Sequence, residues 1–399
     1  MKTNEIMAMD SKYFMNTFGA RTPVCFEYGN GMKLYDMEGR EYYDFLGGIA
    51  VNALGYSHPA LVEAIKSQAE KLIHCSNLYY IEPQAKLAKL LVDNSCADRV
   101  FFANSGAEAN EGAIKLAKIY FKKNGMPNKY GIITLVNSFH GRTLTTVAAT
   151  GQAKYQKPYA PLMPGFKHVL LNDFDALKAA VDDETCAIMM EPVQGESGVN
   201  PADDSYVKAV RKLCDKKGLL LIFDEIQTGI GRTGKLFGYQ HYGVEPDIFT
   251  LAKALAGGVP IGALCAKEHV AAAFEPGDHG STFGGNPLAC AAGLAVMQTI
   301  FKSSLVANAE EVGNYFKGSL KKLSIKYSII TEVRGLGLMI GIQLSEGTAK
   351  EIKDKLLSSG FLVGNVGSNI IRLLPPLIIT KEDVDIFIDA FDKVLDAKQ

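Results

Sequence analysis

The 399-residue sequence lacks several features that mark whole classes of protein. Its net charge is −1 at pH 7, so no excess of positive charge favours binding to nucleic acid or to an anionic membrane surface. No apolar run reaches the roughly 18 residues that a membrane-spanning helix needs. The first residues, MKTNEIMAMD, lack the basic and then apolar pattern of a signal peptide. We therefore expect a protein of the cytoplasm.

Cysteine is also used sparingly. The seven cysteines are odd in number and scattered, and no two form a Cys-x-x-Cys pair. That pattern favours free thiols in a reducing compartment over a disulfide framework. No pair of histidines or cysteines has the spacing of metal ligands, so we predict no metal site.

What the sequence does contain is a repeated alternation of apolar runs and amphipathic stretches. The runs 100–104, 131–137, 168–171, 186–192 and 219–225 have strand length and are apolar almost throughout. Strands that are apolar on both faces are typical of parallel sheets covered by helices. We therefore predict an α/β fold, in which ligands bind at the carboxyl ends of the strands.

The two ends of the chain have a different pattern. Residues 20–46 alternate in short runs with glycine turns, like an antiparallel meander, and residues 305–399 combine helices with short strands. We expect the segments 1–50 and 296–399 to form one smaller α+β domain beside a large domain over residues 51–295. No proline- or serine-rich linker marks the boundary near residue 295.

Small and polar residues follow several of the apolar runs. The turn Ser105–Ala107 opens a helix, with Glu108 in a capping-box pattern, and the free N–H groups of such a turn suit a phosphate. An ordinary capped helix is the alternative. Asp224 ends an apolar run, where a carboxylate either meets a cation or a protonated ring nitrogen, or faces solvent.

One lysine interrupts the apolar run 246–258, PDIFTLAKALAGG. A buried ammonium is unfavourable unless it is paired or neutralised. Lys253 therefore either extends to water along its aliphatic stem or is not an ordinary ammonium.

The run FHGR, residues 139–142, follows another predicted strand. An aromatic ring and an arginine at a strand end could stack on a flat ligand and bind a carboxylate. Alternatively, Phe139 lies in the core and Arg142 in a surface ion pair. No partner for His140 can be named from the sequence, and we assign it no role.

The stretch GIGRTG, residues 229–234, formally matches a dinucleotide-binding motif. Such a motif links a strand directly to a helix, whereas EIQT precedes this stretch and no helical period follows it. We interpret it as a glycine-rich loop.

Taken in order, these motifs resemble the class III pyridoxal-phosphate-dependent aminotransferases, from about Phe18 to Arg372. The motifs are SGAEA, FHGR, EPVQGESG, FDEIQTGIGRTG, TLAKALAGGVPIGA and STFGGNPL. The resemblance implies fold type I, a mainly parallel seven-stranded sheet flanked by helices, with a smaller α+β domain from both chain ends. It also implies pyridoxal 5'-phosphate as cofactor and a homodimer with active sites at the subunit interface.

The resemblance further implies roles for individual residues. Lys253 would carry the cofactor covalently and move the substrate proton, and Asp224 would pair with the pyridine nitrogen. Among the substrate contacts, Glu196 would neutralise Arg372 while an amine substrate is bound. The remaining cofactor contacts would be Ser105, Gly106, Ala107 and the partner subunit's Thr282 at the phosphate, Phe139 and Ile226 on the ring faces, and Gln227 at the ring hydroxyl. The remaining substrate contacts would be Arg142 and the partner subunit's Ser281.

A finer likeness suggests the substrate. The runs MNTFGARTP, FLGGIAVNALGYSHP and SNLYYIEPQAKLA most resemble members that transfer the δ-amino group of acetylornithine to 2-oxoglutarate in arginine biosynthesis. Phe18 and Ala20 stand where many relatives carry tyrosine and arginine, so ornithine, succinylornithine and 4-aminobutyrate stay open as substrates. An NAD-dependent oxidoreductase or a binding protein without activity would have no use for Lys253.

Overall fold

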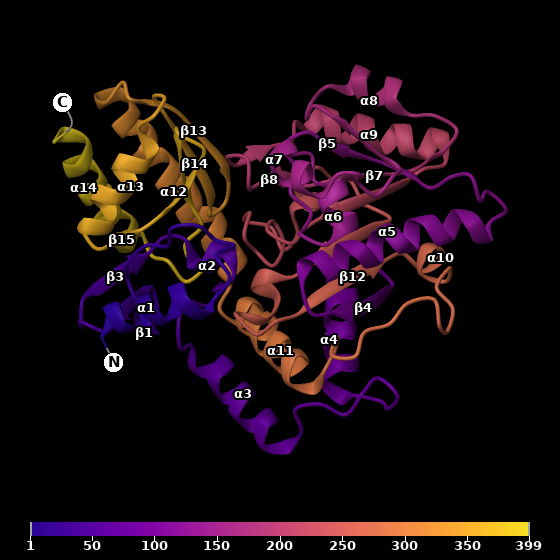
Figure 1. Cartoon of the computed structure of the whole chain (residues 1–399), viewed down its shortest axis with the longest axis horizontal. Coiled ribbons are helices and arrows are strands. Elements are labelled where there is room, and N and C mark those ends of the chain that lie inside the picture. The colour runs from indigo at the N-terminus through magenta and orange to yellow at the C-terminus, as the bar shows by residue number, and fades with distance from the viewer. Residues whose placement is uncertain (1, 398–399) are drawn as a thin grey trace.

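The computed structural model describes residues 2–397 and has a seven-stranded sheet at its centre (Figure 1). The strand order is β4-β12-β11-β10-β7-β5-β6, and β12 runs antiparallel to both neighbours while the other adjacent strands are parallel. The strands are β4 (Arg99–Ala103), β5 (Gly131–Leu135), β6 (Phe166–Val169), β7 (Thr185–Met190), β10 (Leu220–Asp224), β11 (Ile248–Leu251) and β12 (Gly262–Ala266). The predicted mainly parallel seven-stranded sheet is confirmed.

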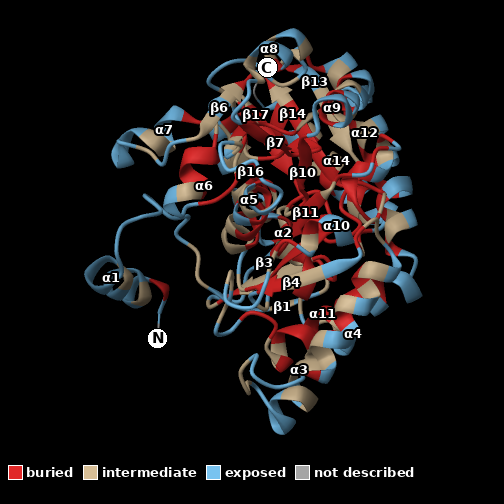
Figure 2. Ribbon diagram, turned by 90° about the vertical axis from the view of Figure 1, so that its right-hand side faces the viewer, coloured by how far each residue is buried: buried red, intermediate tan, exposed pale blue. Residues whose placement is uncertain are grey.

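The central strands are buried on both faces because successive side chains point to opposite sides of a sheet. In β10, Leu221 and Phe223 belong to one core cluster, and Leu220 and Ile222 belong to another. Helix α5 (Gly106–Lys123) packs in the second cluster and helix α9 (Asp204–Lys217) in the first. Figure 2 shows these strands as the buried centre of the molecule. This two-sided burial explains why the strand sequences are apolar almost without alternation.

Strands from both chain ends share a second sheet, of order β1-β2-β3-β15. Its first three strands form the predicted antiparallel meander, and β15 adds in parallel to β3. The strands are β1 (Phe26–Asn30), β2 (Lys33–Asp36), β3 (Glu41–Asp44) and β15 (Phe361–Leu362). A further four-stranded sheet has the order β13-β14-β17-β16, with β13 (Ile330–Leu336), β14 (Met339–Leu344), β16 (Gly364–Val366) and β17 (Ile370–Leu373). Both ends of the chain therefore lie together, at the left of Figure 1.

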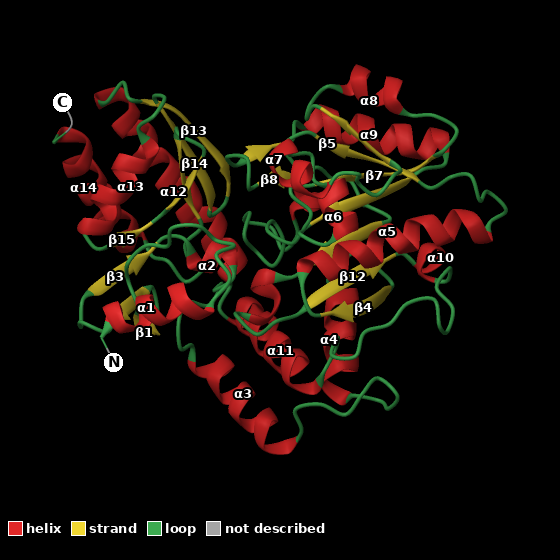
Figure 3. Cartoon of the chain, in the orientation of Figure 1, coloured by secondary structure: helices red, strands yellow, loops and turns green. Residues whose placement is uncertain are grey.

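Helices surround these sheets (Figure 3). Besides α5 and α9 they are α1 (Thr3–Tyr13), α2 (Gly47–Ala50), α3 (Pro59–Lys71), α4 (Glu82–Asp93), α6 (Leu144–Ala149), α7 (Ala153–Gln156), α8 (Phe174–Ala180), α10 (Glu268–Ala271), α11 (Pro287–Lys302), α12 (Leu305–Lys326), α13 (Ala349–Ser358) and α14 (Lys381–Asp396). The short 3-10 helices are η1 (Lys157–Tyr159), η2 (Gly238–His241) and η3 (Lys253–Ala256), and β8 (Val193–Gln194) pairs with β9 (Asn200–Pro201). Within residues 2–397, no single helix is long and apolar enough to cross a membrane. Helices α11 and α12 together reach that length and apolar composition, but they are bent by 64° at their junction.

The stretch 229–234 is a loop, as predicted. Turn residues separate it from β10, and the four-residue η2, rather than a long helix, follows it. Arg232 within the loop is buried and donates through Nη1 to the carbonyl oxygens of Leu338 and Pro375. The loop therefore fastens the central sheet to the C-terminal part of the chain, and its geometry does not fit a dinucleotide site.

Candidate active site

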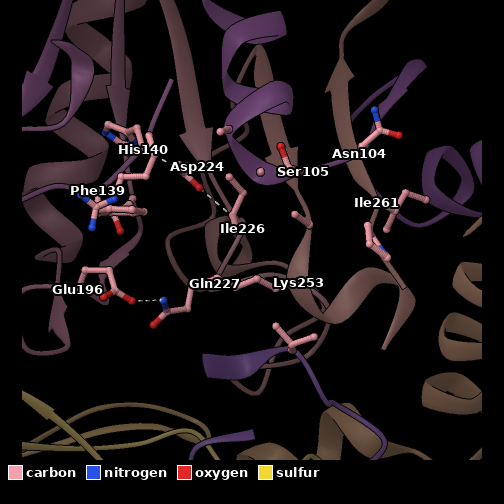
Figure 4. Close-up of a pocket in the computed structure, with 18 of the residues that line it drawn as sticks. Asn104, Ser105, Phe139, His140, Glu196, Asp224, Ile226, Gln227, Lys253 and Ile261 are labelled. Atoms are coloured by element: carbon pink, nitrogen blue, oxygen red, sulfur yellow. Dashed lines mark hydrogen bonds and ion pairs between the residues drawn. The ribbon is translucent and has the colours of Figure 1, made fainter. Parts of the chain in front are cut away.

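A cavity of about 400 Å³ lies at the carboxyl ends of the central strands (Figure 4). Strands β4, β5, β10 and β11 all deliver side chains to it, which is the placement expected for an open parallel sheet. The cavity brings together many residues that the sequence predicted, namely Ser105, Gly106, Ala107, Phe139, Arg142, Glu196, Asp224, Ile226, Gln227 and Lys253. The strand-end rule therefore locates the cavity correctly.

Three predicted residues do not line this cavity. Arg372, on β17, lies behind Glu196. Ser281 accepts a hydrogen bond through Oγ from Asn104 Nδ2 (3.1 Å), and Thr282 is exposed to solvent. Asn77 Nδ2 donates to the carbonyl oxygens of Ser281 (3.0 Å) and Gly284 (2.9 Å), so the segment that carries Thr282 is held at the surface of this chain.

Asp224 is held at the end of β10 by several hydrogen bonds. Its Oδ2 accepts from Asn110 Nδ2 and lies 2.8 Å from His140 Nδ1, and its Oδ1 accepts from the N–H of Ile226 (3.1 Å). Asn110 is itself fixed, because its Oδ1 accepts from the Thr250 hydroxyl (2.7 Å). The carboxylate is only 3% exposed, so it can present one defined orientation to a ligand. The alternative that Asp224 faces solvent is wrong.

Nothing in the sequence assigns a role to His140, and no sequence signal indicates Asn110. Both side chains are buried and contact Asp224 directly, and His140 Nε2 has no partner within the described structure. His140 follows β5, which is separated from β10 in the sheet only by β7. Because 84 positions separate His140 from Asp224 in the chain, no local pattern could name this contact.

Lys253 lies two residues beyond the end of β11 and begins η3, with Ala252 as its N-cap. Its φ is +43°, a left-handed conformation that is uncommon for a residue with a side chain and often marks a functional position. Burial lowers the pKa of Lys253, partly offset by the negative charges of Glu196 and Asp224, which raise it. A lysine of this kind can be present as a neutral amine, the form that acts as nucleophile and base.

Glu196 and Arg372 form an ion pair beside the cavity. Arg372 Nη1 lies 2.6 Å from Glu196 Oε1 and also donates to the carbonyl of Gly195 (3.0 Å), and Arg372 Nε has no partner in residues 2–397. Burial alone would raise the pKa of Glu196, but Arg372 and Lys253 together lower it below its ordinary value. The two side chains therefore form a charged pair.

Gln227 connects this ion pair to the cavity. Its Nε2 donates to Glu196 Oε1 at 3.3 Å, the contact dashed in Figure 4. Its Oε1 is buried and has no partner within the part of the chain that the structure describes. A buried carbonyl oxygen without a donor is costly, so this atom is ready to accept a hydrogen bond from a ligand.

Arg142 is exposed and stacks on aromatic rings. Its guanidinium carbon lies 3.9 Å from the centre of the Tyr155 ring and 5.4 Å from that of Phe139. No acidic residue among residues 2–397 forms an ion pair with it, so the alternative of a surface ion pair is wrong. A stacked guanidinium keeps its N–H donors free for a carboxylate.

The turn before α5 has free donors. Ser105 is the N-cap, and its Oγ accepts from the N–H of Glu108 (3.2 Å). The carboxylate of Glu108 accepts from the N–H of Asn104 (2.6 Å), so the reciprocal half of the predicted capping box is shifted by one residue. The N–H groups of Gly106 and Ala107, at the first two helical positions, have no acceptor within the helix. The positive end of the helix dipole and these donors suit a phosphate.

These residues fit pyridoxal phosphate. The cavity contains an amine with a lowered pKa, Lys253, a buried carboxylate, Asp224, and a helix N-terminus with unoccupied donors at Gly106. The unpartnered Oε1 of Gln227 adds an acceptor in the same cavity. The cofactor carries an aldehyde, a ring nitrogen, a ring hydroxyl and a phosphate, and each of these groups has a matching residue type here.

Comparison with known proteins assigns the family. The model of the aminotransferase class-III family matches residues 15–395. The chain is 55% identical to the acetylornithine aminotransferase of Caldanaerobacter subterraneus subsp. tengcongensis, over 98% of this chain and 99% of that protein. It is also 55% identical to the acetylornithine aminotransferase of Methanocaldococcus jannaschii, over 97% of this chain and 96% of that protein.

Solved structures of aminotransferases have the same fold as this chain. The ornithine aminotransferase of Toxoplasma gondii, described with partial occupancy of pyridoxal phosphate at its active site, has a TM-score of 0.94 and 33% identity, over 99% of this chain and 95% of that one. The acetylornithine aminotransferase of Elizabethkingia anophelis has a TM-score of 0.89 and 34% identity, over 100% of both chains. Sequence, fold and cavity thus point the same way: the chain belongs to the class-III aminotransferase family.

Proposed function

We propose that the chain is an acetylornithine aminotransferase. It transfers the δ-amino group of N2-acetyl-L-ornithine to 2-oxoglutarate, giving N-acetyl-L-glutamate 5-semialdehyde and L-glutamate, a reaction of arginine biosynthesis. The observation that carries this proposal is the 55% identity to proteins named for that activity, over 97–98% of this chain. The cavity supports it with an amine, a buried carboxylate and Arg142, and Arg372 lies behind Glu196.

Pyridoxal phosphate, when bound, supplies an electron sink for the charge left when the substrate carbon loses its proton. We assign Lys253 to hold the cofactor and to take and return that proton through Nζ. Asp224 would keep a proton on the ring nitrogen, with its carboxylate held in place by His140 and Asn110. Gln227 would donate to or accept from the ring hydroxyl.

The cofactor's remaining contacts come from the cavity wall. The N–H groups at the start of α5 would bind the phosphate, which places Ser105, Gly106 and Ala107 around it. Phe139 and Ile226, which both line the cavity, would cover the two ring faces and exclude water.

Two arginines would serve the two half-reactions. Arg142 would hold the α-carboxylate of acetylornithine and the distal carboxylate of 2-oxoglutarate, since its guanidinium is accessible. Arg372 would bind the α-carboxylate of glutamate, for which its contact with Glu196 must open. While the pair is closed, the positive charge of Arg372 is neutralised, and an uncharged part of an amine substrate can lie beside it.

We propose that the chain works as a homodimer in the cytoplasm. The partner subunit's Thr282 would join the phosphate site, and the partner subunit's Ser281 would lie near the substrate. In support, the segment with Ser281 and Thr282 carries Phe283, which is 61% exposed, and Asn77 ties it to Leu78 and Tyr80, which are also exposed. Neighbouring exposed apolar side chains are typical of a protein–protein contact. Analytical ultracentrifugation would then give twice the 43.2 kDa mass of the chain.

Within each subunit we assign residues 51–295 to a large cofactor-binding domain. Residues 1–50 and 296–399 make the smaller domain. The shared sheet of β3 and β15 supports this division, because its strands come from both ends of the chain. Residue 295 lies within helix α11, so this boundary follows the packing of the two domains and not an exposed linker.

Two measurements test the function. A substrate panel with 2-oxoglutarate as acceptor compares acetylornithine, succinylornithine, ornithine and 4-aminobutyrate, and we expect the highest kcat/KM for acetylornithine. Borohydride reduction followed by digestion and mass spectrometry should locate the cofactor on Lys253, and Lys253→Ala should lose at least about 10⁴-fold in kcat. A higher rate with ornithine, or an adduct at another lysine, would contradict the proposal.

A further inference from the structure

Glu191 is a buried carboxyl group of the cavity that takes no part in the proposed reaction. It directly follows β7, lines the cavity and is 6% exposed. Its Oε2 accepts a hydrogen bond from the N–H of Phe139 (3.1 Å). No lysine, arginine or histidine of residues 2–397 forms an ion pair with it. A buried carboxylate without a cation is costly, so its charge state needs an explanation.

The surroundings of Glu191 disfavour a negative charge. The other titratable or charged residues that line the cavity are His140, Arg142, Glu196, Asp224 and Lys253. Two of them are acids that already have partners, Arg372 for Glu196 and the His140–Asn110 pair for Asp224. Burial raises the pKa of Glu191 well above its ordinary value, and the charges of Asp224 and Glu196 raise it further. The N–H of Phe139 opposes this shift without reversing it.

We propose that Glu191 is a positioning residue that works as an uncharged acid. One oxygen accepts the main-chain N–H of Phe139 and holds that ring at the cavity wall, while the O–H remains a hydrogen-bond donor inside the protein. Only the effect of Glu191 on catalysis rests on the proposed aminotransferase function. The charge state itself belongs to the folded chain, whatever reaction it performs.

The consequence concerns Lys253. A negative charge on Glu191 would raise the pKa of Lys253, as Glu196 and Asp224 do. An uncharged Glu191 fixes Phe139 without adding this third negative charge. Lys253 can then give up its proton more readily and act as a base.

Two substitutions of Glu191 distinguish the effect of its shape from the effect of its charge. Glutamine has the same shape as a protonated glutamic acid, with one carbonyl oxygen to accept the Phe139 N–H and an amide to donate. We expect Glu191→Ala to lower kcat/KM by about tenfold or more, because it leaves that N–H unpaired. The separate variant Glu191→Gln should keep kcat/KM within about threefold of the wild type. Loss in Glu191→Gln equal to that in Glu191→Ala, or failure of Glu191→Gln to fold, would overturn the proposal.

A matched control is Glu196→Gln, five residues along the same segment. Glu196 is charged and paired, so its amide variant removes a charge that the ion pair needs. We expect Glu196→Gln to change the ratio of rates with acetylornithine and glutamate, and Glu191→Gln to leave that ratio within about twofold. A changed ratio in Glu191→Gln would show that Glu191 works through its charge.

Infrared spectroscopy reads the charge state without reference to activity. In the purified holoenzyme at pH 7, we expect a carboxylic-acid C=O band that shifts in D2O and is missing from Glu191→Gln. Absence of a band difference between wild type and Glu191→Gln would overturn the proposal. If the wild type shows this band but no aminotransferase activity, the proposed function fails while the assignment of Glu191 stands.

Discussion

The two ends of the cavity are held in opposite ways. At one end, Asp224 receives hydrogen bonds from two side chains and one main-chain N–H, and one of those donors, Asn110, is held in turn by Thr250. At the other end, Glu196 meets Arg372 in a single side-chain ion pair, and Arg372 Nε has no partner in the described residues.

This difference matches two different tasks. A group that must keep one orientation gains from several fixed donors. An arginine that must exchange one carboxylate for another gains from a single ion pair. Only one carboxylate then has to move away before the other can bind. Under the proposed function, the cavity has a fixed end at Asp224, and its exchangeable end is Glu196 with Arg372 behind it.

We expect the largest loss of activity from a substitution at the fixed end, Asp224→Asn. Asp224→Asn keeps the shape of the side chain and removes the charge that, under the proposed function, would keep a proton on the ring nitrogen. We expect kcat to fall by about 100- to 1000-fold, as for loss of one electrostatic contact to the reacting system. Steady-state kinetics measures this, and circular dichroism checks that the variant is folded. Turnover near that of the wild type would remove Asp224 from the mechanism.

A smaller effect is expected at the exchangeable end. Glu196→Ala leaves Arg372 positively charged and free for any carboxylate. Glutamate should then bind more easily and the ω-amine substrate less well, so the ratio of the two half-reaction rates should change by about tenfold. Stopped-flow measurement of both half-reactions gives this ratio. An unchanged ratio would show that the Glu196–Arg372 contact does not select substrates.

The smallest effect links the two ends through Lys253. Burial lowers the pKa of Lys253 and the Glu196 carboxylate raises it, so Glu196→Ala should lower this pKa further. The neutral amine then appears at lower pH. We expect the pH midpoint for recombination of cofactor-free enzyme with pyridoxal phosphate to fall by about half a pH unit. A midpoint that rises, or does not move, would contradict this electrostatic coupling.

The sequence predicts the sheet well because its strands are buried on both faces. Runs of five or more apolar residues leave few alternatives, and the polar residue after each run lies at the ligand-binding edge. Asp224 and Ser105 follow from this rule, whereas Lys253 was predicted as a single charge within an apolar run, and all three line the cavity. Glu191 obeys the same rule after β7 and was overlooked, since the run EPVQGESG was interpreted only through Glu196.

Contacts between strands that are distant in the chain cannot be predicted in this way. The pairing of His140 with Asp224 requires that β5 and β10 flank β7, and sequence patterns give strand positions but not strand order. Likewise, Arg372 Nε and Gln227 Oε1 are buried without a hydrogen-bond partner in the described residues. This depends on the positions of neighbouring backbone atoms, which the sequence does not give. Family resemblance assigned roles to Arg372 and Gln227 without revealing these unmet hydrogen bonds.

The reversed direction of β12 has an architectural consequence. Since β11 arrives at the cavity edge and β12 departs from it, the connection between them meets the cavity twice. Ala252 and Lys253 line it at the start of the connection, and residues 258–261 line it at the end. Gly257 (φ +57°) and Gly258 (φ +116°) make the bend of this connection possible, as conformations that side chains disfavour. A longer or stiffer bend there would displace Lys253 and the lining residues 258–261 together, so the size of this part of the cavity is coupled to the position of the lysine.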